Sequence, residues 1–179
     1  MAGELMALEA MERYSPLGPD FLTWLCIRII EGEMPTLDNI PLEFTIKGPI
    51  TLEGSGGEAT KVTLAGEEAP GSPEFCSALS EGKKLVRARL VLVEGADQYE
   101  FSLNGETFDF GSVKIPVPKV PDLDQYLSDR VVAFQHLAEI IDRLYEAWLP
   151  LRLTPAEWKK ETAAWRRLGK KLNDGRQPG

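Results

Sequence analysis

The most informative part of the sequence is residues 80–116, SEGKKLVRARLVLVEGADQYEFSLNGETFDFGSVKIP. It begins with the end of a helix and a glycine, and three predicted strands follow at 85–93, 98–103 and 107–115. Apolar side chains recur at every second position of the first strand, at Val86, Ala88, Leu90 and Leu92. Because the turns between the three strands are short and rich in Gly, Asn and Asp, we expect an antiparallel sheet of neighbouring strands.

The first of these strands also carries a high density of positive charge. Lys83 and Lys84 precede it, and Arg87 and Arg89 share one of its faces, since alternate side chains of a strand point the same way. Four cations within seven residues, in a protein of net charge -8, indicate a surface that handles a polyanion. The alternative is a solvated strand face whose arginines pair with acidic neighbours.

Helices and a second hairpin precede this stretch. Asp20 is expected to cap a buried helix over residues 21–31, which is apolar nearly all round. Alternating apolar residues over 42–52 and 60–64, on either side of a GSGG sequence, predict a β-hairpin. A further short helix should begin after Ser72, a serine cap followed by proline.

Two helices are expected at the C-terminal end. The first, over residues 128–149, has apolar side chains at three- and four-residue spacing and should stop or kink at Pro150. Thr154 and Glu157 form a capping-box signature for the last helix, over 156–172. Two tryptophans and three cationic doublets lie on this last helix: Trp158, Trp165, Lys159, Lys160, Arg166, Arg167, Lys170 and Lys171.

These elements predict an α+β fold, in which an antiparallel β-meander sheet has helices packed on one face. We expect a domain of residues 1–150 followed by a basic C-terminal helix in a tail of residues 151–179. The tail has eight Lys or Arg against three acidic residues, a net charge of +5, so the first 150 residues carry -13. Such a basic tail is typical of contact with nucleic acid or an acidic partner, although its tryptophans could instead pack on the body. If it contacts phosphates, removal of residues 153–179 should leave the rest folded.

Composition argues against several classes of function. No apolar run is long enough for a membrane span, and the first residues lack the pattern of a secretion signal, so a cytoplasmic protein is expected. Cys26 and Cys76 lie far apart and predict no disulfide framework. The single histidine, His136, lies beside an apolar stripe, and no Cys/His cluster has metal-ligand spacing. We therefore expect no enzyme, no metal and no cofactor.

Five segments, taken in their order along the chain, form a pattern that can be compared with known families. They are LGPDFLTWL at 17–25, ALSEGKKLVRARLVL at 78–92, YEFSLN at 99–104, FDFGSVKIP at 108–116 and DRLYEAWLPLR at 142–152. Over roughly residues 17–152, this order resembles the C-terminal half of the recombination-associated protein RdgC family.

The resemblance implies a toroidal homodimer that encircles double-stranded DNA without sequence preference, associates with the nucleoid and limits the filament activity of a RecA-type recombinase. Only the GK-x-V-R segment maps residue by residue, onto Gly82, Lys83 or Lys84, Val86 and Arg87, whose basic members would line the DNA-facing surface. Members of the family are longer and have an N-terminal half without a counterpart here. The basic C-terminal helix also has no match in the family pattern.

Two hypotheses of function follow. The first is a DNA-binding protein that modulates homologous recombination, with the ten cations Lys83, Lys84, Arg87, Arg89, Lys159, Lys160, Arg166, Arg167, Lys170 and Lys171 as its contacts. The second is a non-enzymatic interaction or oligomeric module, in which an acidic body and a basic tail pair between subunits. A salt-dependent shift of labelled duplex DNA would separate the two.

Overall fold

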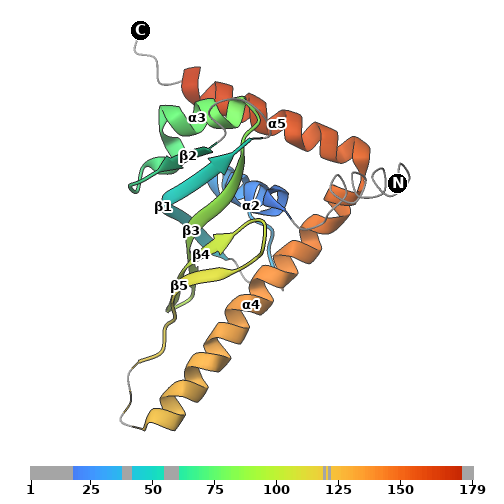
Figure 1. Cartoon of the computed structure of the whole chain (residues 1–179). Helices are drawn as coiled ribbons and strands as arrows, with labels where there is room; N and C mark the ends of the chain where they lie inside the picture. Colours follow the sequence, from blue (N-terminus) through green and yellow to red (C-terminus); the bar gives the residue numbers. More distant parts are fainter. Residues whose placement is uncertain (1–17, 38–41, 55–60, 119, 121, 175–179) are drawn as a thin grey trace, which may run out of the picture.

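Five antiparallel strands form a single sheet in the order β2-β1-β3-β4-β5 in the computed structural model (Figure 1). The structure describes residues 18–37, 42–54, 61–118, 120 and 122–174. The strands are β1 (Glu43–Glu53), β2 (Lys61–Leu64), β3 (Lys84–Glu94), β4 (Asp97–Asn104) and β5 (Phe110–Lys114). The helices are α2 (Pro19–Glu31), α3 (Pro73–Ser80), α4 (Leu123–Leu153) and α5 (Pro155–Asp174), with a 3-10 turn η1 (Ala69–Gly71) before α3. The predicted α+β architecture is therefore confirmed.

The register of the strands separates an apolar inner face from a polar outer face. Leu90 of β3 lies between Ile46 of β1 and Phe101 of β4, and all three are buried. One residue earlier, Arg89 lies between Lys47 and a serine of β4 on the opposite face. The helices cover the inner face, so the outer face is left open to solvent along its charged rows.

α2 is buried against the inner face of the sheet. Its Thr23 hydroxyl donates to the carbonyl of Pro19 at 2.7 Å and accepts from the backbone N–H of Leu85 on β3 at 2.8 Å. The expectation that Asp20 caps this helix is wrong, because the cap position is Gly18. Asp20 lies in the first turn and accepts instead from Arg152 Nε at 2.9 Å.

α4 is longer at both ends than the sequence predicted. It begins after Asp122, whose carboxylate accepts from the N–H groups of Asp124 and Gln125 at 3.0 and 3.2 Å. Pro150 does not end the helix, which continues to Leu153. Proline has no backbone N–H, so the helix loses one hydrogen bond at this position, to the carbonyl four residues earlier.

β5 begins at residue 110 and not at 107. The side-chain oxygen of Asn104 accepts from the N–H groups of Glu106 and Thr107, at 2.8 and 3.2 Å, which closes a turn after β4. Phe108 then adopts a positive φ of 60°, which is incompatible with a strand. The predicted hairpin of β1 and β2 is present, although residues 55–60 of its loop lie outside the described residues.

α5 is packed on α3 and shares the core of the sheet domain. Trp165 belongs to the buried cluster and is 4% exposed. A Cβ added to Gly169 would lie 2.7 Å from the carbonyl oxygen of Cys76, so the two helix backbones approach closely. The expected boundary at residue 150 falls inside α4, and the packing of the described residues shows no break there.

Candidate nucleic-acid interface

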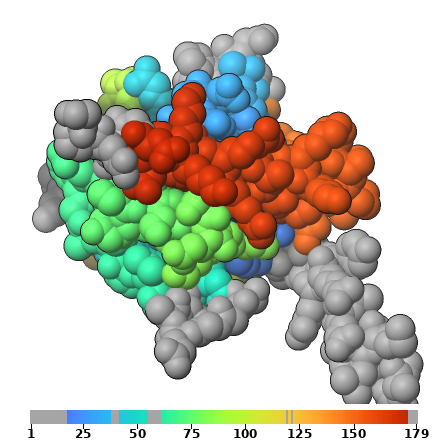
Figure 2. Space-filling view, turned by 90° about the horizontal axis from the view of Figure 1, so that it is seen from above, coloured from blue at the N-terminus to red at the C-terminus, as the bar shows by residue number. Residues whose placement is uncertain are grey.

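Six lysine and arginine side chains project from one side of α5. At about 100° per residue they fall within an arc of about 140°, and their Cα atoms extend over about 18 Å of helix. All six are exposed: Lys159, Lys160, Arg166, Arg167, Lys170 and Lys171. Seen from above, α5 lies across the surface of the molecule beside α3 (Figure 2). We call these six residues the basic face of α5.

The opposite side of α5 is anchored by aromatic rings. Trp158 meets Trp165 edge to face with their centroids 5.0 Å apart, and it meets the fully buried Trp148 of α4 at 6.0 Å. An ion pair between Arg28 of α2 and Glu161 of α5, at 2.7 Å, adds a second attachment. Because the apolar side of α5 is fixed in this way, the basic face has to point toward solvent.

Two of the β3 cations lie close to the basic face. Lys83, Lys84 and Arg166 line a pocket of about 180 Å³ at the turn that follows α3. Gly82 makes this turn with a φ of 86°, and a Cβ there would lie 3.0 Å from Arg166 Nη2, so the guanidinium rests over the turn. Both lysines already have anionic partners: Lys83 pairs with Glu81 at 2.9 Å and Lys84 pairs with a carboxylate of α2.

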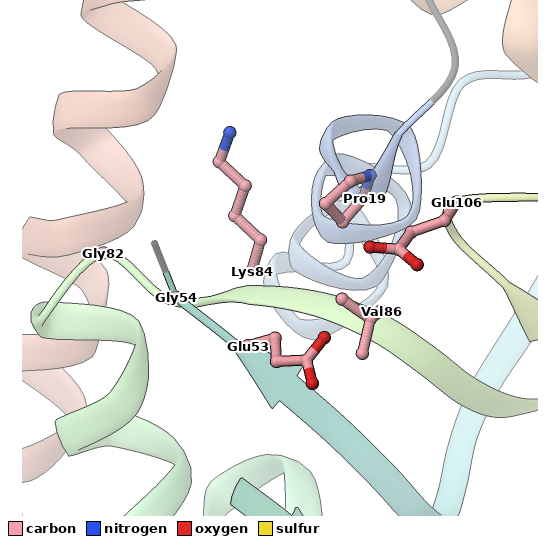
Figure 3. A pocket seen from close by; sticks show the side chains of 7 residues that line it. All are labelled: Pro19, Glu53, Gly54, Gly82, Lys84, Val86 and Glu106. Carbon is pink, nitrogen blue, oxygen red and sulfur yellow. The ribbon is translucent and has the colours of Figure 1, made fainter. Parts of the chain in front are cut away.

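A larger pocket of about 430 Å³ adjoins this turn on the side of α2. Figure 3 shows Lys84 rising from β3, with Glu53 of β1 and Glu106 of the turn after β4 among the lining residues. Lys84 pairs with Asp20, and two carboxylates line the same space. This lining disfavours an anionic ligand, so we do not include the larger pocket in the interface.

Arg87 and Arg89 lie elsewhere, on the outer face of the sheet. Arg89 pairs with Glu100 of β4, and Lys114 of β5 reaches the same carboxylate at 3.2 Å. Burial tends to raise the pKa of Glu100, but the hydrogen bond from Lys114 and the charges around it leave that pKa below its usual value. Arg87 is exposed and makes no ion pair with a described residue. The alternative interpretation, in which the arginines of this strand pair with acidic neighbours, therefore holds for Arg89.

The ten predicted cations thus fall into two separate regions. Eight of them gather at α5 and the turn after α3, and two lie on the outer face of the sheet. Sequence reasoning missed Lys47 and Lys114, which belong to the outer-face group. Lys47 alternates with apolar residues in the predicted strand, but only the register of β1 against β3 places it beside Arg89.

The single histidine lies beside a carboxylate, and the two cysteines are buried. His136 Nε2 lies 2.6 Å from a Glu94 carboxylate oxygen across α4 and the end of β3. Cys26 and Cys76 are fully buried, and burial raises the pKa of the Cys26 thiol far above its usual value. Within the described residues, no group of three His, Cys, Asp or Glu side chains could hold a metal ion. None of the described helices has both the length and the apolar character that a bilayer crossing requires.

Comparisons with protein families, with curated proteins and with solved structures gave no match to this chain.

Proposed function

We propose that this protein binds duplex DNA through the phosphate backbone, without sequence preference, and that the basic face of α5 makes the main contacts. The observation that carries the proposal is the anchoring of α5 by Trp158 and Trp165, which holds six cations outward in one arc. Flexible cations would lose conformational freedom on binding, whereas cations on a packed helix are already arranged.

The dimensions of the basic face suit a nucleic-acid backbone. Phosphates of one strand are spaced by 3.4 Å along the axis of a duplex, so about 18 Å of helix runs beside roughly five base steps. Lys83, which lines a pocket together with Arg166, extends the face toward the turn after α3. Contacts to phosphate carry no sequence information, and we therefore expect similar affinity for unrelated duplexes.

The biological role that we propose rests on the resemblance to the RdgC family. A protein that covers duplex DNA without sequence preference competes with a RecA-type recombinase for the same substrate. We accordingly propose that this chain modulates homologous recombination, at the nucleoid, by occupying DNA.

The test is a substitution of three exposed α5 cations, Lys159→Gln, Arg167→Gln and Lys170→Gln, in one variant. Each lost phosphate contact lowers the slope of log affinity against log salt by about 0.9, so the slope should fall by nearly three. The matched control removes three cations elsewhere, by Lys61→Gln, Arg130→Gln and Arg143→Gln. Equal affinity of the two variants for a duplex would refute a role for α5.

A second candidate function is a protein-interaction module, and the N-terminal half of α4 favours it. Leu123, Leu127 and Val131 are 64%, 51% and 57% exposed, and they continue the stripe whose later members are buried. Figure 1 shows this part of α4 extending past the sheet. An apolar stripe on a projecting helix would suit a second copy of the chain, in line with the expected homodimer.

A further inference from the structure

The uncovered outer face of the sheet contains a polar pocket of about 370 Å³. None of its lining residues belongs to the basic face of α5. Strands β1 to β5 all contribute to it. Its lining consists of one proline, four hydroxyl side chains and two arginines: Pro49, Thr51, Thr63, Ser102, Ser112, Arg87 and Arg89. No carboxylate is among these lining residues, in contrast to the pocket beside α2.

Two of the four hydroxyl side chains of this pocket are buried in the sheet, and the other two, Thr63 and Ser112, are exposed. Thr51 and Ser102 are only 8% and 9% exposed, and the Thr51 and Thr63 hydroxyl oxygens lie 3.4 Å apart across β1 and β2. Ser112 has a φ of 52°, an uncommon conformation for a residue other than glycine, and such conformations concentrate at functional sites. A hydroxyl group can donate a hydrogen bond to an oxyanion.

Gly111 brings a hydroxyl and a guanidinium together. A Cβ at this position would lie 2.7 Å from Ser102 Oγ and 3.5 Å from Arg87 Nη2, so both groups approach the same small volume beside the glycine backbone. Arg87 has no ion-pair partner among the described residues, which leaves its donors available to a ligand. A guanidinium can offer two parallel donors to one phosphate.

Arg89 adds an unsatisfied donor to the same pocket. Its Nη2 end pairs with Glu100, whereas its Nε is buried and lacks a hydrogen-bond partner among the described residues. Buried donors are nearly always satisfied in folded proteins, so an unpaired one calls for a ligand, an ion or a water. Glu100 thereby holds a guanidinium that lines the pocket and whose Nε is unsatisfied.

The electrostatic balance of this face is also favourable to an anion. Lys47, Arg89 and Lys114 act on the carboxylate of Glu100, and Arg87 lines the same pocket, so these five residues together carry a charge of +3 on a protein of net charge -8. Partly desolvated charges interact more strongly than fully exposed ones. A small anion would therefore be attracted to this face and not repelled by the acidic protein as a whole.

We propose that this pocket binds a single phosphate group, with Arg87 as its principal ligand and Ser102, Ser112 and Thr63 as hydroxyl donors. The group could belong to a small phosphorylated molecule or to a nucleic-acid backbone, since both present the same oxyanion. The proposal does not depend on α5, and a failure of the α5 variants to affect DNA binding would leave it intact.

The experiment titrates inorganic phosphate into the ¹⁵N-labelled protein at constant ionic strength near neutral pH, with chloride as the balancing anion. We expect saturable shifts of the Ser102, Ser112 and Thr63 amides. Arg87→Gln should weaken the binding about tenfold or more, because it removes charged hydrogen bonds, whereas Lys61→Gln on the neighbouring strand β2 should leave it unchanged. Absence of saturable shifts in the wild-type protein, or equal affinity of the two variants, would overturn the proposal.

A second variant tests the shape of the pocket without any change of charge. Gly111→Ala places a methyl carbon 2.7 Å from Ser102 Oγ, too close for both to keep their places, so that hydroxyl must move. We therefore expect this variant to abolish the phosphate-dependent shifts, while the melting temperature confirms that the protein remains folded. Unchanged phosphate affinity in this variant would contradict the assigned geometry. Duplex titrations then identify the source: Arg87→Gln weakens duplex binding if the ligand is a backbone phosphate, and leaves it unaltered if the ligand is a small molecule.

Discussion

Gly169 decides how closely α5 approaches α3. A Cβ there would meet the backbone of α3 at two points, 2.7 Å from the carbonyl oxygen of Cys76 and 2.8 Å from the nitrogen of Ser80. Such distances are too short for real Cβ atoms, and neither backbone atom can rotate away. A helical glycine at this place is therefore a packing requirement, which offsets its poor helix propensity.

Gly169→Ala should accordingly destabilise the protein, although alanine is favoured over glycine in helices by about 1 kcal/mol. Overpacking of a close interface costs about 1–3 kcal/mol, so we expect a net loss of about 1 kcal/mol in the free energy of unfolding. Denaturant titration measures it. Lys170→Ala, at the exposed neighbouring position, is the control and should change stability by less than about 0.5 kcal/mol. A stabilised Gly169→Ala protein would show that the helices are not in contact.

The ionisation of Glu100 makes the stability of the protein depend on pH. Its pKa lies below the ordinary 4.5 because the hydrogen bond from Lys114 and the charge of Arg89 outweigh the opposing effect of burial. A carboxylate whose pKa is lower in the folded than in the unfolded chain stabilises the fold above the unfolded value. That contribution disappears as the pH falls through the folded value.

Glu100→Gln should therefore lower the free energy of unfolding at neutral pH, and the difference from wild type should shrink as the pH is lowered below 4.5. Urea titrations at a series of pH values measure this difference. A difference that stays constant down to strongly acidic pH would mean that the ion pairs of Glu100 contribute nothing to stability.

At the scale of elements, α4 combines two different roles in one helix. Its C-terminal half carries the buried Leu144 and Trp148, both 0% exposed, whereas Leu127 in the N-terminal half is 51% exposed. Periodicity shows which side of a helix is apolar, but it does not show how far the rest of the molecule extends along that side. The sequence therefore predicted one continuous apolar stripe, and the rest of the molecule covers only part of it.

Two identical substitutions on α4 separate these halves. Leu144→Ala should cost about 2–5 kcal/mol, because it leaves a cavity in the core. Leu127→Ala should cost less than about 0.5 kcal/mol in the monomer, since its side chain is already half exposed. Denaturant titrations of both variants at low protein concentration test the difference. Equal losses would place Leu127 in a buried interface.

Charge placed on the exposed stripe tests the interaction module directly. If a second copy covers the N-terminal half of α4, Val131→Glu should convert the dimer to a monomer, because a buried unpaired carboxylate is costly. Sedimentation velocity measures the change, and Glu139→Gln on the same helix is a control with an exposed polar side chain. If the wild-type protein is monomeric at all concentrations, a second copy of the chain does not cover this stripe.

Across the whole molecule, local sequence signals predict the helices and strands. The predictions that failed depend on contacts between residues far apart in the sequence. Strand alternation and the Ser72 cap predict the meander and α3 well, because they depend on neighbouring residues only. Asp20 was misassigned because its partner Arg152 is 132 residues away. For the same reason, the sequence could not tell that Lys84 pairs with Asp20, while Arg87 has no ion-pair partner among the described residues.

The packing of α5 also changes what the removal of residues 153–179 would do. Sequence reasoning expected the rest of the chain to remain folded, but Trp165 and Gly169 are buried against α3. We now expect truncation to lower the melting temperature, so that a loss of DNA binding after truncation would be uninformative. Point substitutions on the basic face avoid this difficulty.

Phosphate contacts between this acidic protein and duplex DNA should make its affinity depend steeply on salt. The most direct measurement is the affinity of the wild-type protein for two unrelated duplexes over a range of salt concentrations. With six or more phosphates contacted, affinity should fall by a factor of about 10³ or more between about 50 and 200 mM salt, equally for both duplexes. A flat salt response, or no binding at micromolar protein, would contradict the account.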